Sequence, residues 1–246
     1  MGFAHGEKGT DMNDGRVNDR GGHDPIAPVD RTPLRLRREA WGFGIGSLCF
    51  MAGAFPAYGD WLGAVAVGIT FFVGSLFFTA AGFIQLSLSG RRPPRSHTNL
   101  ADRADWWAAA VQFAGTLCFN VSTGVALAAA IAAPEVLGAG WRPDAFGSIA
   151  FLVSSGLAVV ATRHRLALWD SHARTWHGTW LNMIGSVAFA VSAVGAYVSP
   201  VTGDFVSQFW ANLGTLLGAL CFFFAAVLSR RPRERHEGVV GPVWDR

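Results

Sequence analysis

The sequence predicts an all-α integral membrane protein with six transmembrane helices, built as three tandem helical hairpins in parallel orientation. Three observations predict this fold class: long apolar stretches, arginines concentrated in alternate connections, and a five-residue motif in every predicted helix. The composition also favours a membrane protein over an ordinary soluble domain, because 51% of the 246 residues are hydrophobic and only 15% are charged.

Six stretches of 18 or more residues contain no Asp, Glu, Lys or Arg. A helix of roughly 20 apolar residues crosses the hydrocarbon of a bilayer, and a helix pairs its backbone polar groups internally, as lipid requires. The fourth helix is expected to start late and to be short, because Asp144 precedes its motif glycine by only three residues. The predicted helices are Arg38–Tyr58, Asp60–Leu88, Asp105–Ala133, Asp144–Thr162, Thr175–Ser199 and Phe205–Ser229.

The arginines favour one orientation in the membrane. They gather before the first predicted helix, between the second and third, between the fourth and fifth, and after the sixth, whereas Arg142 alone lies in the opposite connections. Because Lys and Arg are in excess on the cytoplasmic side, both termini are predicted to be cytoplasmic. We expect the lipid bilayer as the main partner, with anionic headgroups at the cytoplasmic arginines, and no nucleic acid.

These features divide the chain into tails, hairpins and loops. Residues 1–37 are expected to form a disordered cytoplasmic tail, because they are rich in Gly, Asp, Asn and Arg and poor in large apolar side chains. The three transmembrane hairpins are expected at 38–90, 105–162 and 175–229, with cytoplasmic loops at 91–104 and 163–174 and a basic cytoplasmic tail at 230–246.

A motif of the form G-[STA]-x-x-F occurs once in each predicted helix. The copies in the first helices of consecutive hairpins are 69 and 70 residues apart, and those in the second helices are 73 and 71 apart. A two-helix unit repeated in this way keeps every hairpin the same way up, so the spacing predicts the same topology as the arginines. The copies begin at Gly46, Gly74, Gly115, Gly147, Gly185 and Gly218.

The motif glycines are predicted to be helix-packing residues. Small side chains recur seven and eight residues after each glycine, on the same face of the helix. Helices in lipid associate where small residues permit close approach, and the motif phenylalanine is expected to fill the groove beside this seam. A glycine-lined pore is the alternative interpretation.

Two of the outer connections share the pattern P-x-x-G-D, at Pro56–Asp60 and at Pro200–Asp204. Proline ends or bends the incoming helix, glycine supplies the turn, and aspartate is a good cap for the outgoing helix. We therefore expect both segments to be turns, with ligand binding as the minor alternative.

Four segments carry the motif in similar surroundings: FFVGSLFFTAAGFIQL, WWAAAVQFAGTLCFNVSTG, WRPDAFGSIAFLVSSGLA and ANLGTLLGALCFFF. They resemble bacterial membrane proteins with YrhK-like domains, and the resemblance spans roughly Trp41 to Ser229. It implies a helical-hairpin fold in a bacterial inner (plasma) membrane and transfers no active site.

No acidic or basic side chain is expected well inside a span, although such groups usually mark ion pathways and proton relays. The candidate site residues are uncharged amides that either bond between hairpins or line a polar path or solute site. They are Gln112, Asn120, Asn182 and Asn212. No metal, cofactor or catalytic residue is expected, and Cys49, Cys118 and Cys221 are predicted to be small packing residues.

The leading hypothesis is a non-enzymatic, multi-pass inner-membrane protein with a structural, accessory or regulatory role. The alternative is a transporter or channel that carries a small neutral or weakly polar solute through the helix bundle. An intramembrane enzyme ranks third, because it would need a nucleophile with a base or a metal with its ligands. The sequence leaves open whether the chain forms a homo-oligomer or has another membrane partner.

Overall fold

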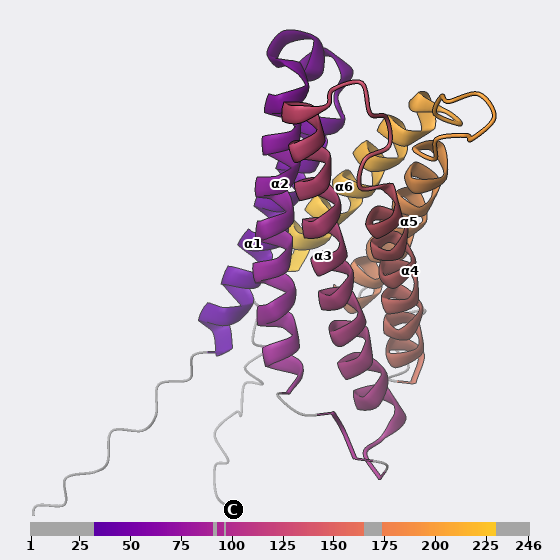
Figure 1. Ribbon diagram of the computed structural model, residues 1–246. Coiled ribbons are helices and arrows are strands. Elements are labelled where there is room, and N and C mark those ends of the chain that lie inside the picture. Colours follow the sequence, from indigo (N-terminus) through magenta and orange to yellow (C-terminus); the bar gives the residue numbers. More distant parts are fainter. Residues whose placement is uncertain (1–31, 91–92, 96, 165–173, 230–246) are drawn as a thin grey trace, which may run out of the picture. The chain divides into compact units, whose positions relative to one another are not determined.

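The computed structural model describes residues 32–90, 93–95, 97–164 and 174–229 (Figure 1). Within these ranges every regular element is an α-helix, and α2 to α6 are long and apolar enough to cross a membrane. The first helix, α1, is less apolar over its length, because Arg37, Arg38 and Glu39 lie in its first half. The helices are α1 (Thr32–Ala54), α2 (Pro56–Ser89), α3 (Leu100–Ala132), α4 (Trp141–His164), α5 (Arg174–Gly195) and α6 (Gln208–Ser229).

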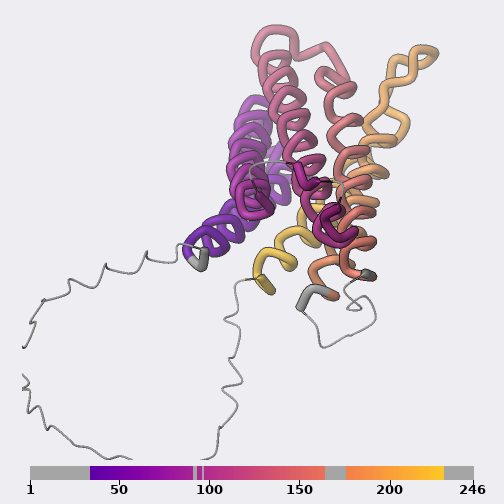
Figure 2. Tube along the Cα trace, turned by 90° about the horizontal axis from the view of Figure 1, so that it is seen from below, coloured from indigo at the N-terminus to yellow at the C-terminus, as the bar shows by residue number. Residues whose placement is uncertain are grey.

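Each helix packs against the next one along the chain, and α1 also packs against α6, which closes the helices into a ring. Figure 1 shows the connections α1–α2, α3–α4 and α5–α6 at one end of this ring and the α2–α3 connection at the other. Figure 2 views the helices from below, with α6 beside α1. We call the end with the three connections the outer end and the opposite end the inner end, after the orientation that the arginines predict.

The first helix starts six residues before the predicted Arg38, so residues 32–37 are helical and do not belong to a disordered tail. Pro33 is the second residue of this helix. Proline is tolerated in the first turn because its missing N–H would be unpaired there in any case. Leu34, Arg35 and Leu36 are good helix formers. The rest of the predicted N-terminal tail and the predicted tail at 230–246 lie outside the described residues.

The third helix begins at Leu100, inside the predicted loop 91–104. The Asn99 side chain accepts a hydrogen bond from the backbone N–H of Asp102 at 2.9 Å and donates one to the Asp102 carboxylate at 2.6 Å. Such a cap satisfies an amide that every helix start leaves unpaired. The cap therefore extends the helix beyond its apolar part, from which the boundary was predicted.

The turn predicted at Pro56–Asp60 is wrong. Pro56 is the first residue of α2, and only Phe55 separates α2 from α1. Proline is favoured at the first position of a helix, where its fixed φ suits the backbone. The chain instead leaves helical geometry at Gly63, where φ is 80° and ψ is 168°, a conformation that glycine adopts without steric strain.

The turn predicted at Pro200–Asp204 is present, but Asp204 does not cap the helix that follows. Gly203 supplies the turn with a φ of 73°. α6 begins four residues after Asp204, and the Ser207 side chain accepts a hydrogen bond from the N–H of Trp210 at 3.3 Å. Serine is an equally good cap, so the helix starts at the later of two candidate caps.

The fourth helix starts at Trp141 and has 24 residues, whereas α1 has 23 and α5 and α6 have 22 each. Measured from the motif glycine, the helix does start late, as predicted: α4 begins six residues before Gly147, whereas α6 begins ten before Gly218. The prediction that the helix is short is wrong. Gly138 and Gly140, with φ values of 67° and 81°, form the turn before it. Asp144 consequently lies within the first turn of the helix, three residues after its first residue, and it is not the N-cap residue.

Candidate solute path through the helix ring

The motif glycines lie where the two helices of each pair cross. A Cβ atom added to one glycine would lie between 2.9 and 3.2 Å from the carbonyl oxygen of the other, in the pairs Gly46 with Gly74, Gly115 with Gly147, and Gly185 with Gly218. A larger residue would force the backbones apart at these points. This close approach of backbones is how small residues hold helices together in lipid.

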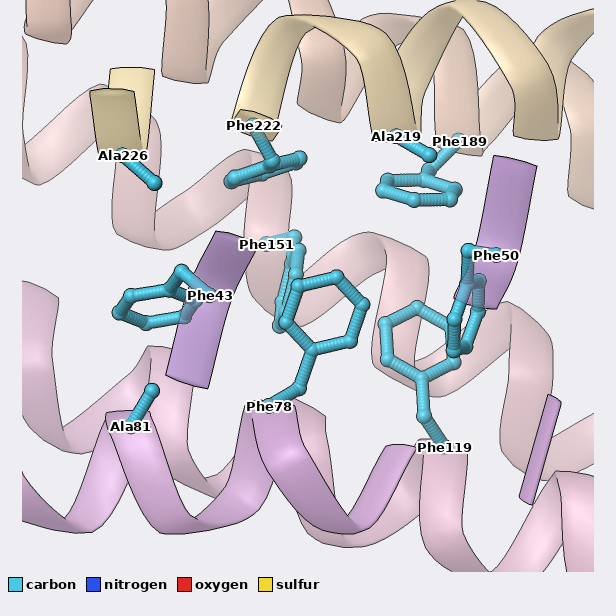
Figure 3. Close-up of a cluster of buried hydrophobic side chains, with 10 residues drawn as sticks. All are labelled: Phe43, Phe50, Phe78, Ala81, Phe119, Phe151, Phe189, Ala219, Phe222 and Ala226. Carbon is cyan, nitrogen blue, oxygen red and sulfur yellow. The ribbon is translucent and has the colours of Figure 1, made fainter. Parts of the chain in front are cut away.

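The phenylalanine of each motif packs over the motif glycine of the paired helix. A Cβ on Gly115 would lie 2.8 Å from the Phe151 ring, and one on Gly147 would lie 3.0 Å from the Phe119 ring. All six rings then meet in one buried cluster (Figure 3). We call this set the phenylalanine layer: Phe50, Phe78, Phe119, Phe151, Phe189 and Phe222.

The phenylalanine layer closes the centre of the ring. Phe50, Phe119 and Phe189 form a triangle in which the ring centroids are 5.9 to 6.3 Å apart. Phe222 lies beside the triangle, with its centroid 5.5 Å from that of Phe151 and 6.4 Å from that of Phe78. Edge-to-face contacts at such distances are favourable, and rings in mutual contact leave no open passage at this level.

A cavity of about 410 Å³ lies on the outer side of the layer. Its lining comes from all the helices of the ring and from the α3–α4 connection, and it is largely Ala, Gly and aromatic. The triangle of Phe50, Phe119 and Phe189 forms its floor. Its polar lining includes Asn212 and Asp144, so this hollow combines apolar walls with a few polar groups, as ligand sites commonly do.

A second cavity, of about 340 Å³, lies on the inner side of the layer. Its lining includes Gln112 from α3, Asn182 from α5, and the carboxylates of Glu39 and Asp105. On α1, α2, α3, α4 and α5 the lining residues lie on the inner side of the motif phenylalanine along the helix. The phenylalanine layer therefore separates the two cavities.

The predicted polar residues divide between these two cavities. Gln112 and Asn182 lie together in the inner cavity and Asn212 lies in the outer one. Asn120 lines neither; its side-chain oxygen is buried without a hydrogen-bond partner among the described residues. Three of the four amides thus face a cavity.

One of the four amide side chains, that of Gln112, also bonds between helices, as the other interpretation predicts. The Ser154 hydroxyl lies 3.1 Å from Oε1 of Gln112 and 2.8 Å from the carbonyl oxygen of Ala108. The Ser155 hydroxyl donates to the backbone carbonyl of Asn182 at 3.2 Å. Gln112 therefore both holds α3 to α4 and lines the inner cavity.

Asp144 is a cavity residue that the sequence interpretation missed, because the residue was placed at the start of the fourth predicted helix and outside the spans. It precedes Gly147 by three residues and Phe151 by seven, and these spacings place side chains on one face of a helix. Phe151 faces the centre of the ring. The same spacing in the sequence was the available signal that Asp144 faces inward.

No three His, Cys, Asp or Glu side chains of the described residues lie close enough to hold a metal ion. A scan against protein-family models gives no match, and searches of the curated proteins and of the solved structures give none either. The resemblance to YrhK-like membrane proteins therefore stays a prediction from the sequence motifs.

Proposed function

We propose that the chain is a bacterial inner-membrane protein whose six helices all span the bilayer, as three parallel hairpins with both termini cytoplasmic. The third residue of each motif supports six spans. It is a large aliphatic side chain, at least 37% exposed, on every helix including α1: Leu48, Leu76, Leu117, Ile149, Val187 and Leu220. The ring thus presents an apolar belt to its surroundings, and such a belt is stable in hydrocarbon.

We further propose that a small, weakly polar solute passes through the centre of this ring without chemical change. One observation carries the proposal: two cavities with polar linings lie on opposite sides of a single closed aromatic layer. A path needs an entrance at each membrane face and a barrier between them. Apolar constrictions serve as such barriers in channels, because they exclude water until they open.

A structural or accessory role, which the sequence favoured, is the second candidate. The close glycine crossings and the contact of all six phenylalanine rings favour it, because both give a rigid and sealed bundle. A purely structural bundle, however, has no need of cavities lined by amides and carboxylates, since intramembrane polar groups are costly unless they have a function.

The test is solute flux through the purified full chain in proteoliposomes, measured by stopped-flow light scattering with glycerol and by release of radiolabelled choline. We expect the wild type to exceed protein-free vesicles. Phe189→Ala removes one corner of the triangle and should raise the rate at least severalfold. Phe224→Ala is the matched control, because Phe224 is 49% exposed on the outside of the ring.

Truncating a buried phenylalanine costs about 3 to 5 kcal/mol of stability, so Phe189→Leu, which leaves a smaller gap, is assayed beside it. Folding of each variant is checked by gel filtration in detergent. If the wild type and both folded variants show no more solute flux than protein-free vesicles, the proposed passage is wrong. The structural or accessory role then remains as the candidate function.

A further inference from the structure

We propose that the outer cavity binds a small organic cation, with the Asp144 carboxylate as its counter-charge. The inference deepens the proposed function, on which it rests, by giving the class of the solute. The cavity volume of about 410 Å³ falls in the range of small-molecule sites. The inference replaces the neutral or weakly polar solute expected from the sequence with a solute that has an apolar body and a single positive charge.

The charge of the cavity lining is the first argument. The chain has more basic than acidic residues, 20 against 17, yet Asp144 is the one ionisable side chain among the described residues that line the outer cavity. Arg142 is exposed and lines an adjacent hollow at the outer end of α4, which shares Gly138 and Trp141 with the outer cavity. A cation bound inside the outer cavity therefore meets an attractive charge and no basic side chain among the described lining residues.

The lack of a partner for this carboxylate is the second argument. Among the described residues, no side chain forms a hydrogen bond or ion pair with the Asp144 carboxylate. Its position in the first turn of α4 gives it some stabilisation from the helix dipole. That stabilisation is small beside the cost of removing a charge from bulk water, so a bound cation would supply the missing compensation.

The aromatic walls are the third argument, and they select the kind of cation. The rings of Phe50, Phe119 and Phe189 form the floor, and Trp141 stands in the wall, held by a 2.7 Å hydrogen bond from its indole N–H to the carbonyl of Ala193. Aromatic faces attract alkylated ammonium groups, the usual ligands of such cages. A metal ion would instead need several oxygen ligands, and the described residues provide no group of three.

The inner cavity has the same sign of charge. Its ionisable lining residues are Glu39 and Asp105, with no Arg, Lys or His among the described residues that line it. Both cavities thus have acidic linings among the described residues. A cation would therefore find favourable charge on either side of the phenylalanine layer.

The test is equilibrium dialysis of radiolabelled choline against the purified full chain in lipid nanodiscs. Tetramethylammonium and 3,3-dimethyl-1-butanol, the neutral isostere of choline, serve as competitors. We expect saturable choline binding, displacement by tetramethylammonium, and at least tenfold weaker displacement by the neutral isostere. Equal displacement by the two competitors, or no saturable binding of choline, overturns the proposal; neither result depends on a variant.

Variants then locate the site. Asp144→Asn should weaken choline binding at least tenfold, whereas Asp144→Glu, which keeps the charge, should retain it within a few fold. Asp204→Asn is the matched control, because Asp204 is exposed at the same end of the ring and does not line the cavity. Unchanged binding by a folded Asp144→Asn variant overturns the assignment.

The two experiments can reject the solute passage and the cation site independently of each other. Saturable choline binding without flux in proteoliposomes rejects the passage and supports the cation site. Glycerol flux without cation binding rejects the cation site and leaves the passage standing.

Discussion

The second residue of each motif is small and buried, and whether it finds a partner depends on the neighbouring helix. The hydroxyl of Ser186 in α5 lies 2.8 Å from that of Ser155 in α4. The hydroxyl of Ser47 in α1 is buried without a partner among the described residues. α6 packs against α1 and offers no hydroxyl at the equivalent positions. Its second motif residue is Ala219, and Ala226 stands where α4 has Ser155. The orphan hydroxyl is therefore explained by what the adjacent hairpin lacks.

At this scale we predict opposite effects of the same substitution in two helices. Ser186→Ala removes an interhelical hydrogen bond and should lower the free energy of unfolding by about 0.5 to 1.5 kcal/mol. Ser47→Ala removes a buried group with no partner, so the free energy of unfolding should be unchanged or higher. Both are measured by unfolding in mixed detergent micelles, and an equal loss for the two variants would contradict the prediction.

At the scale of elements, the points where two helices cross determine which glycines the packing requires. A Cβ on Gly74 would lie 2.7 Å from the Cβ of Cys49 and 2.9 Å from the ring of Phe50. Gly156, which also lies within a helix, has no such neighbour within 4 Å. The two glycines look alike in sequence, and only the paired helix makes one of them necessary.

We therefore predict that the change from glycine to alanine separates the two positions. Gly74→Ala should lower the free energy of unfolding by about 1 to 3 kcal/mol, the usual effect of overpacking. Gly156→Ala should raise it by about 0.5 to 1 kcal/mol, because alanine loses less backbone entropy in a helix. Thermal unfolding followed by circular dichroism in detergent compares them, and destabilisation by Gly156→Ala would disagree with the predicted sign.

The closed ring and its two cavities belong to the scale of the whole molecule. The contact of α1 with α6 brings the two ends of the helical region together, and it lets Phe50 of α1 meet Phe189 of α5, with ring centroids 6.1 Å apart. An open row of hairpins would leave these rings exposed. Closure therefore creates both the phenylalanine layer and the cavity on each side of it.

The orientation of the ring in the membrane gives a third prediction. In a chain with Cys49, Cys118 and Cys221 replaced by alanine, Val201→Cys should react with a membrane-impermeant maleimide in intact spheroplasts, because Val201 is 93% exposed at the outer end. His97→Cys, in the exposed inner connection, should react only after permeabilisation. The reverse labelling pattern would overturn the topology predicted from the arginines.

Local signals in the sequence predicted much of the fold. The helical class, the approximate positions of the helices and the packing role of the motif glycines were predicted from hydrophobicity, charge and residue spacing. These patterns reflect interactions between residues that are close in the sequence. Boundaries were missed where a single cap or proline overrode the apolar pattern, as at Asn99 and Pro56. Gln112, Asn182 and Asn212 were identified as candidate site residues because an amide in lipid is conspicuous in any sequence.

Which of the candidate residues face a cavity was decided by the tertiary structure alone. Asp144 resembles a helix cap in sequence and lines the outer cavity only because the α3–α4 turn ends before Trp141. Each motif phenylalanine is explained locally as a filler over a glycine, whereas the contact of all six depends on closing α1 against α6. The sequence determined the helices and their small faces by itself, since these depend on neighbouring residues. The phenylalanine layer and the cavities depend on contacts between distant residues, so only the folded ring defines them.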